Sequence, residues 1–138
     1  MHAKITPLTD TLAVASQISA DDIEEIAAQG YRVLINNRPD DEEPGQLSST
    51  EARAAAEAAG LAYHYLPFTA GTLTETDIAA FGKLLDQADG PVLAHCRSGT
   101  RCCLIWSATQ LKDGGSADAL IADGAAKGFE ISALKRFA

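Results

Sequence analysis

The chain has 138 residues and carries 19 acidic against 11 basic side chains, which gives a formal net charge of −8. Its hydrophobic fraction of 46% and charged fraction of 22% are those of a globular domain, so disorder is excluded as the main state. The acidic balance argues against a nucleic acid or an anionic membrane as partner. We expect residues 1–138 to form a single domain.

Nothing in the sequence predicts a membrane span or a signal peptide, because no apolar run is long enough for either. We therefore expect a cytoplasmic protein. The three cysteines, Cys96, Cys102 and Cys103, fall within eight residues, which does not suit the disulfide framework of a secreted domain. A metal site is not expected, since only His95 adds a ligand nearby, and no cofactor is predicted.

Strands and helices are predicted to alternate along the first half of the chain. The segment 12–17 is predicted as a short strand, and a helix follows from the N-cap Ser19 to Gly30. The apolar run 31–36 is typical of a buried strand. The Ala-rich segment 49–59 is typical of a helix that ends at a glycine.

The alternation continues in the second half. Here we predict a strand over 62–68, a helix capped by Thr74 or Thr76, a strand over 92–96, a helix from Gly99 to about Leu111, a helix from 114–116 and a short terminal helix. Strands that alternate with helices imply an α/β fold of three layers. A mainly parallel central sheet is then covered by helices on both faces.

The segment VLAHCRSGTRCC at 92–103 carries the chemistry. A buried strand ends at His95 and Cys96, a short loop follows, and Gly99 precedes a helix. Unpaired N–H groups and the positive dipole end of that helix would form an anion-binding loop, residues 97–101. With Arg97 and Arg101 close, Cys96 is expected to be largely a thiolate.

The members of the anion-binding loop have distinct expected roles. Cys96 is the predicted nucleophile, and Arg101 is the predicted bidentate ligand of an oxyanion. The rest of the loop is expected to supply N–H groups and charge through Arg97, Ser98, Gly99 and Thr100. His95 is expected to shape the loop by hydrogen bonding to its backbone.

The pattern His95-Cys96-x-x-Gly99-x-Arg101 resembles the active-site loop of Cys-dependent phosphatases and rhodanese sulfurtransferases. Together with INNRPDDE at 35–42 and YHYLPF at 63–68, it resembles a narrower family. This is the small dual-specificity-phosphatase-like domain found alone or fused to beta-lactamase-like persulfide dioxygenases. The resemblance implies a Cys-dependent phosphatase-like fold.

Two departures from the phosphatase pattern favour sulfur transfer. The four residues between Cys96 and Arg101 match the rhodanese spacing, whereas the phosphatases usually have five. The position of their general acid is occupied by Thr69 and Ala70, and Asp77 is expected to lie in the first turn of the next helix. Thiosulfate needs no general acid, because sulfite leaves as a stable anion.

The leading hypothesis is therefore a rhodanese-type sulfurtransferase that works through a Cys96 persulfide. A phosphatase with a phosphocysteine intermediate is the alternative, and a non-catalytic oxyanion-binding module is the second. The expected partners are a small anionic sulfur donor or phosphate ester and a small-thiol acceptor. The resemblance adds a persulfide dioxygenase.

Three features outside the Cys96 to Arg101 pattern also bear on the site. Cys102 is a possible resolving thiol for a reversible disulfide with Cys96, or a small buried thiol in place of a serine. Arg38 either reaches the site or forms a surface ion pair with Asp40 or Asp41. The acidic run 40–43 is expected to be a solvated loop.

Overall fold

Five strands form one sheet in the order β1-β2-β5-β3-β4 in the computed structural model, which describes residues 1–138. All neighbouring strands are parallel except β1 and β2. The strands are β1 (Ile5–Pro7), β2 (Leu12–Ala15), β3 (Val33–Asn36), β4 (Ala62–Tyr65) and β5 (Val92–His95). The predicted mainly parallel sheet is confirmed.

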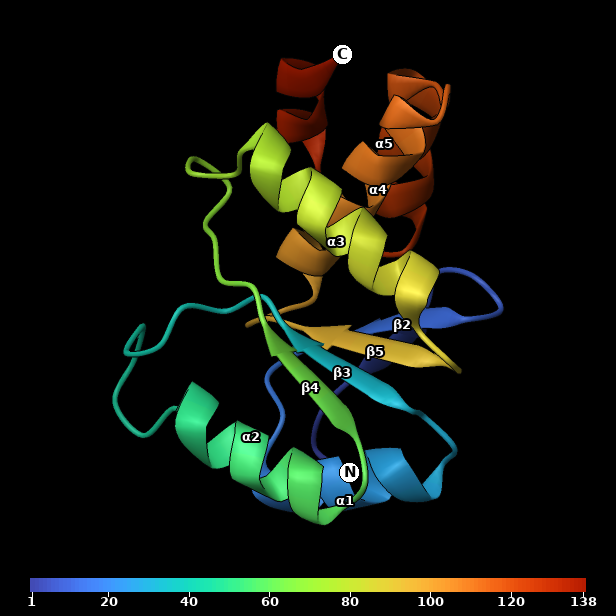
Figure 1. Ribbon diagram of the computed structural model, residues 1–138. Coiled ribbons are helices and arrows are strands. Elements are labelled where there is room, and N and C mark those ends of the chain that lie inside the picture. Colours follow the sequence, from blue (N-terminus) through green and yellow to red (C-terminus); the bar gives the residue numbers. More distant parts are fainter.

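Helices cover both faces of this sheet, which confirms the predicted three layers (Figure 1). One face carries α1 (Ala20–Ala28) and α2 (Ser49–Ala58). The other carries α3 (Glu75–Gln87), α4 (Thr100–Lys112), α5 (Ala117–Ala126) and the 3₁₀ helix η1 (Ser132–Phe137). No helix is both long and apolar enough to cross a membrane.

The sheet divides the core in two, because successive strand residues point to opposite faces. Ile35 packs with Phe81 and Ile105 on the α3 and α4 side, whereas Leu34 packs with Ile23 and other residues on the α1 and α2 side. All four residues of each of β2, β3 and β5 are buried. This explains why their sequences are continuous apolar runs rather than alternating ones.

Side-chain caps fix where the helices begin. Ser19, Ser48 and Thr74 each accept a hydrogen bond from the backbone three residues on, and the acidic side chain there accepts one in return. Thr74, and not Thr76, therefore caps α3. The carboxylate of Asp77 is held in this arrangement, accepting from the Thr74 N–H at 3.1 Å.

One strand was not predicted. β1 pairs antiparallel with β2 at the edge of the sheet, with Ile5 opposite Ala15. It has only three residues and ends at Pro7, so it carries neither the length nor the alternation that identifies a strand in a sequence.

Candidate active site

Cys96 lies at the carboxyl end of the central strand. β5 pairs with β2 on one side and β3 on the other, so that His95 is in register with Ala15 and Asn36. Cys96 follows directly, is fully buried, and donates its N–H to the carbonyl oxygen of Ala15 at 3.3 Å. Ligands of open α/β sheets bind at this end of the strands.

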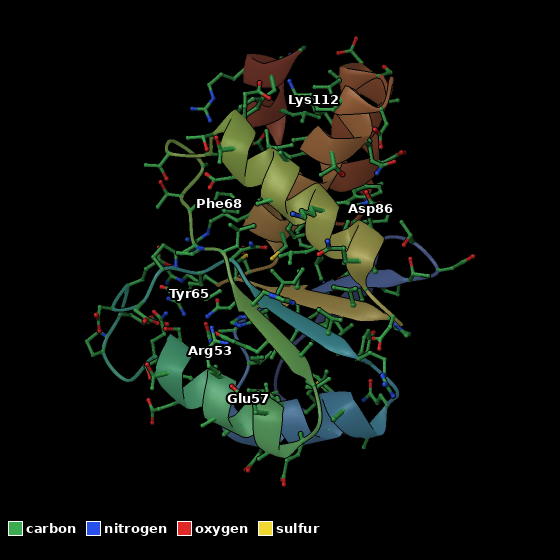
Figure 2. The ribbon with its side chains drawn as sticks, in the orientation of Figure 1. Arg53, Glu57, Tyr65, Phe68, Asp86 and Lys112 are labelled. Carbon is green, nitrogen blue, oxygen red and sulfur yellow. The ribbon has the colours of Figure 1, made fainter.

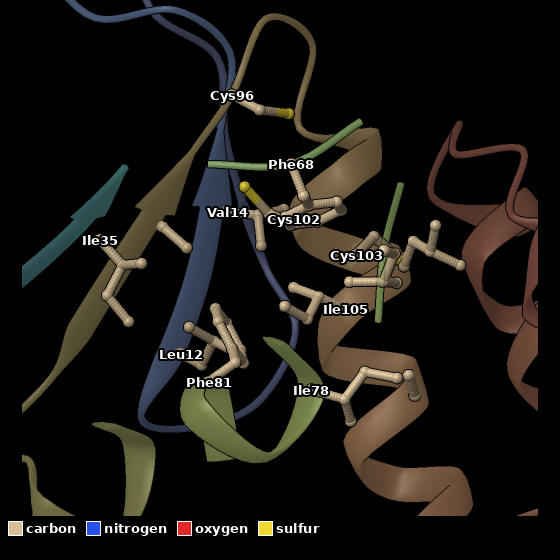
Figure 3. Packing of buried hydrophobic residues seen from close by; sticks show 14 of the residues in the cluster. Leu12, Val14, Ile35, Phe68, Ile78, Phe81, Cys96, Cys102, Cys103 and Ile105 are labelled. Atoms are coloured by element: carbon tan, nitrogen blue, oxygen red, sulfur yellow. The ribbon is translucent and has the colours of Figure 1, made fainter. Parts of the chain in front are cut away.

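The chain turns from β5 into α4 around the sulfur (Figure 3). The N–H of Gly99 donates to the Cys96 Sγ, with 3.1 Å between nitrogen and sulfur. Gly99 has a φ of 96°, and a Cβ there would lie 3.1 Å from the Phe129 ring. α4 begins at the next residue, so the helix N-terminus faces the sulfur.

The pKa of the Cys96 thiol is lowered to about 5. Hydrogen bonding from the Cys102 thiol is the largest cause, burial opposes it, and the N–H groups of Cys102, Ser98 and Gly99 lower the pKa further. Cys96 is therefore a thiolate at neutral pH. The donors that stabilise it belong to the loop and the first turn of α4, whereas the sequence argument also gave weight to two arginine side chains.

Cys102 remains a thiol beside this thiolate. Burial is the first cause that raises its pKa well above the usual value, and hydrogen bonding with Cys96 is the second. Cys103 on the same turn also has a raised pKa because it is buried. All three cysteines are free. The contact between Cys96 and Cys102 fits a hydroxyl-like donor role, and the disulfide between them stays a prediction.

Arg101 points its guanidinium at a carboxylate on another loop. Its Nη1 and Nη2 donate to the two oxygens of Glu42, each at 2.8 Å, and Nη1 also lies 3.4 Å from the carbonyl oxygen of Phe68. The bond to Glu42 raises the pKa of Arg101, and the negative charge of Cys96 acts in the same direction. Figure 2 shows Phe68 on the α3 side of the sheet.

The outer side of the anion-binding loop is open. Arg97 and Ser98 are exposed, and the Ser98 hydroxyl donates to that of Thr100 at 3.1 Å. The carbonyl oxygen of Arg97 accepts a hydrogen bond from the Gln17 N–H at 3.0 Å, which ties the loop to the segment after β2. The anion-binding role of these residues stays a prediction.

Arg38 is not part of a surface ion pair with Asp40 or Asp41, as one sequence expectation had it. It is 1% exposed and its guanidinium donates to Glu42, Glu43 and Gln17. A buried guanidinium requires partners for its charge and donors. The acidic loop supplies them.

The acidic run 40–43 is correspondingly more than a solvated loop. Glu42 contacts both Arg38 and Arg101, and these contacts lower its pKa to about 2, with the Arg101 bond as the largest cause. Asp40 accepts bonds from the N–H and hydroxyl of Ser49. In the sequence, an arginine and several acids follow a strand. This pattern does not distinguish a surface ion pair from the buried contacts that the structure shows.

The ring nitrogens of His95 make no hydrogen bond to residues 97–101, and the loop-shaping role of His95 stays a prediction. His95 is 2% exposed, and neither ring nitrogen has a partner at hydrogen-bonding distance and angle. Burial lowers the pKa of His95 to about 4, so the ring is neutral at pH 7. Its position on the central strand between β2 and β3 leaves the side chain surrounded by core.

Neither the segment after β4 nor Asp77 offers a free carboxyl group as a general acid beside Cys96. Thr69 bonds to Thr72, and the carbonyl oxygen of Ala70 accepts a hydrogen bond from Nη2 of Arg136 in η1 at 3.1 Å. Asp77 is held by Thr74. The segment that follows β4 is therefore fixed by contacts of its own and presents no acid, as the sequence predicts.

Comparison with known proteins decides the family. Residues 4–113 match the family model of the phosphatase-like domain of the beta-lactamase hydrolase-like protein. The chain belongs to this family. A beta-lactamase hydrolase-like protein of Agrobacterium fabrum is 38% identical over 135 residues, and one of Xylella fastidiosa is 40% identical over 129. The two alignments include 97% and 93% of this chain, but only 31% and 30% of the relatives' own length. The chain therefore spans about a third of the length of these relatives.

Solved structures show the same fold. A candidate phosphatase from Neisseria meningitidis has a TM-score of 0.86 and 35% identity, covering 96% of the phosphatase-like domain and 95% of that chain. TpbA of P. aeruginosa has a TM-score of 0.73 and 18% identity, covering 96% and 81%. Tk-PTP has a TM-score of 0.72 and 16% identity over 99% and 97%. The fold is shared with these phosphatase structures.

Proposed function

We propose that the domain is a thiolate-dependent phosphatase in which Cys96 attacks the phosphorus of a phosphate ester. The observation that carries the proposal is the Cys96 sulfur, with a pKa lowered to about 5, held 3.1 Å from the Gly99 N–H at the N-terminus of α4. The phosphatases among the structural neighbours support phosphoryl transfer over the sulfur transfer favoured by the sequence argument. The N–H groups of the anion-binding loop would stabilise the transferring group.

The reaction takes two steps. The thiolate of Cys96 forms a bond to phosphorus as the bond to the leaving oxygen breaks, and this gives a phosphocysteine. Water then attacks phosphorus, phosphate is released, and the electron pair of the P–S bond returns to the sulfur. Arg101 would contact the equatorial oxygens in both steps.

The leaving group distinguishes the substrates that fit this site. Thr69 and Ala70 occupy the segment after β4, and Asp77 is engaged by Thr74, so none of these positions supplies an acid to the leaving oxygen. A missing general acid costs a factor of about 10² to 10⁴ in rate. Esters with stable leaving groups, such as aryl phosphates, are therefore the expected class. A Cys→Ser variant of TpbA has been crystallised with phosphotyrosine, which is an aryl phosphate.

Sulfur transfer is the second candidate, and the same missing acid favours it. Cys96 would attack the sulfane sulfur of thiosulfate, the S–S bond would break, and sulfite would leave without needing a proton. The resulting persulfide would pass its outer sulfur to an acceptor thiolate. The four-residue spacing between Cys96 and Arg101 is consistent with this reaction.

One experiment separates the two candidates. The wild-type protein and Cys96→Ser are incubated with a series of aryl phosphates or with thiosulfate, and intact mass and turnover are measured. We expect a phosphoryl adduct on Cys96, hydrolysis that rises steeply as the pKa of the leaving phenol falls, and no activity in Cys96→Ser. Phosphatase function is rejected if Cys96 gains one sulfur from thiosulfate and no phosphoryl group from any ester.

A further inference from the structure

The buried Arg38 lies between two parts of the candidate site. All three guanidinium nitrogens have partners: Nε donates to Glu42 Oε1 at 2.9 Å, Nη1 to Gln17 Oε1 at 3.0 Å, and Nη2 to Glu43 Oε1 at 3.2 Å. It is the largest fully buried side chain of the protein. Two of its three partners contact the anion-binding loop.

The first connection runs to Arg101. Glu42 Oε1 accepts from Arg38 and from Arg101 Nη2, while its Oε2 accepts from Arg101 Nη1 at 2.8 Å. One carboxylate therefore holds a buried guanidinium and a site guanidinium at the same time. Both arginines keep the Glu42 pKa low, so this carboxylate remains ionised throughout the neutral range.

The second connection runs to the loop backbone. Gln17 accepts from Arg38 through Oε1, and its Nε2 donates to the Ile18 carbonyl oxygen at 2.9 Å, so both ends of the amide are engaged. The backbone N–H of Gln17 donates to the carbonyl oxygen of Arg97 at 3.0 Å. Arg38 thereby contacts the residue that holds the start of the loop.

The contacts of Arg101 leave one edge of its guanidinium unused. Glu42 takes a hydrogen from each of Nη1 and Nη2, and the carbonyl oxygen of Phe68 lies near Nη1. The Nε–H and the second hydrogen of Nη2 have no protein partner. These two donors share the edge of the guanidinium that binds oxyanions bidentately.

We propose that Arg38 is a positioning residue for anion binding, which sets the Arg101 guanidinium through Glu42 and the loop backbone at Arg97 through Gln17. The inference rests on the proposed role of the anion-binding loop. Glu42 binds the Nη1 and Nη2 side of the Arg101 guanidinium, so that the edge formed by Nε and Nη2 is left for the substrate. Arg38 in turn fixes Glu42, because a buried guanidinium that loses a partner is strongly disfavoured.

Glu42→Gln tests the proposal, because the amide has the size of the carboxylate and keeps an acceptor oxygen for the buried Arg38. The probe is tungstate, and the measurement is the concentration that halves the rate of Cys96 alkylation by iodoacetamide. We expect this concentration to rise about tenfold, as the loss of charge-assisted bonds predicts. The alkylation rate without tungstate is measured for each variant, and protection is expressed relative to that rate.

Glu43→Gln is the matched control. It removes the same charge from the same loop, but the carboxylate of Glu43 bonds to Arg38 and not to Arg101, and it is half-exposed. The tungstate concentration that halves Cys96 alkylation should stay within about twofold of the wild-type value. This change is smaller than the one expected when a bidentate pair is lost. Gln17→Met breaks the second connection and should weaken protection by about threefold, a fraction of the loss of a charged hydrogen bond.

The outcomes separate this inference from the proposed function. If tungstate does not protect Cys96 in the wild-type protein, the anion-binding loop itself is refuted, whichever substrate is turned over. If wild type is protected and Glu42→Gln is protected equally well or better, Arg38 and Glu42 do not position Arg101. Weaker protection in Glu42→Gln and in Gln17→Met, with Glu43→Gln unchanged, supports both connections.

Discussion

At the scale of single residues, the reactivity of Cys96 depends on its immediate neighbours. The thiol of Cys102 and three backbone N–H groups lower the pKa of Cys96 enough to outweigh the burial that opposes ionisation. Cys102 can donate because burial keeps it protonated. The two thiols thus have opposite protonation states at neutral pH although they are in contact.

Removing the donor from Cys102 should raise the pKa of Cys96. In Cys102→Ala the thiol hydrogen bond is lost and only the N–H groups remain. Alkylation of Cys96 by iodoacetamide, followed by peptide mapping from pH 4 to 9, should show a titration midpoint shifted upward from about 5.

Cys102→Ser is the control for this variant, since a hydroxyl of similar size still donates. Its midpoint should stay near or below that of wild type. A midpoint in Cys102→Ala equal to that of Cys102→Ser would show that the N–H groups alone stabilise the thiolate.

At the scale of elements, the turn between β5 and α4 requires a glycine for two reasons. Gly99 has a φ of 96°, which side chains disfavour, and the Phe129 ring packs against the face where a Cβ would stand. Phe129 follows α5, so the C-terminal part of the chain supports the anion-binding loop from behind. The loop is a product of three elements and not of its own sequence alone.

Gly99→Ala should destabilise the protein more than a matched glycine substitution. Gly30→Ala, at a φ of 101° with no neighbour within 4 Å, measures the backbone cost alone, about 1 to 2 kcal/mol in urea unfolding. The contact with the Phe129 ring should add about 1 kcal/mol in Gly99→Ala.

The same two variants test how the Gly99 turn affects the reactivity of Cys96. Alkylation of Cys96 at pH 6 should slow in Gly99→Ala, where the Gly99 N–H is displaced, and remain at the wild-type rate in Gly30→Ala. Equal unfolding free energies for the two variants would mean that Phe129 does not constrain the turn.

At the scale of the whole molecule, acid should destabilise the protein through groups whose pKa is lowered by folding. Burial lowers the pKa of His95 to about 4 in the folded chain, whereas the unfolded chain takes up that proton near 6.5. Stability from the neutral ring is therefore complete above about pH 6.5 and is lost as the pH falls towards 4. Glu42, with a pKa lowered to about 2 from 4.5, contributes stability that is lost below that range.

Urea unfolding at pH 7.5 and pH 5 tests the His95 contribution. The test uses Cys96→Ser protein, because the Cys96 thiolate, with a pKa lowered to about 5, loses stability over the same interval. This protein should lose about 2 kcal/mol of unfolding free energy between the two pH values because of His95. Adding His95→Gln should make the loss much smaller, whereas adding His2→Gln, at an exposed position, should leave it unchanged. An unfolding free energy of Cys96→Ser protein that is flat across this interval would contradict a neutral buried His95.

The sequence was sufficient for the fold but only for part of the site. Apolar runs, capping residues and glycines are local signals, and they placed the four parallel strands and all the helices. The position of Cys96 follows from the same signals, because the end of a central parallel strand is fixed by topology. These features depend on residues close together in the chain.

The contacts of Arg38, Glu42 and Arg101 depend instead on side chains far apart in the sequence. Glu42 and Arg101 are 59 residues apart, and no local pattern states which arginine a given acid will meet. The missing partners of His95 and the packing of Phe129 behind Gly99 are likewise outcomes of tertiary packing. Short edge strands such as β1 escape prediction because their signal is too brief.

The strand order has a consequence for how the protein folds. β1 pairs with β2, and β3 with β4, but these two pairs meet only through β5, which comes last among the strands in the chain. Two-stranded pairs are marginally stable alone. The sheet therefore cannot form completely before β5, residues 92–95, inserts between β2 and β3. That insertion also brings Cys96 to its place. Assembly of the sheet and assembly of the reactive centre are thus one kinetic event, and a partly folded chain does not carry a finished thiolate site.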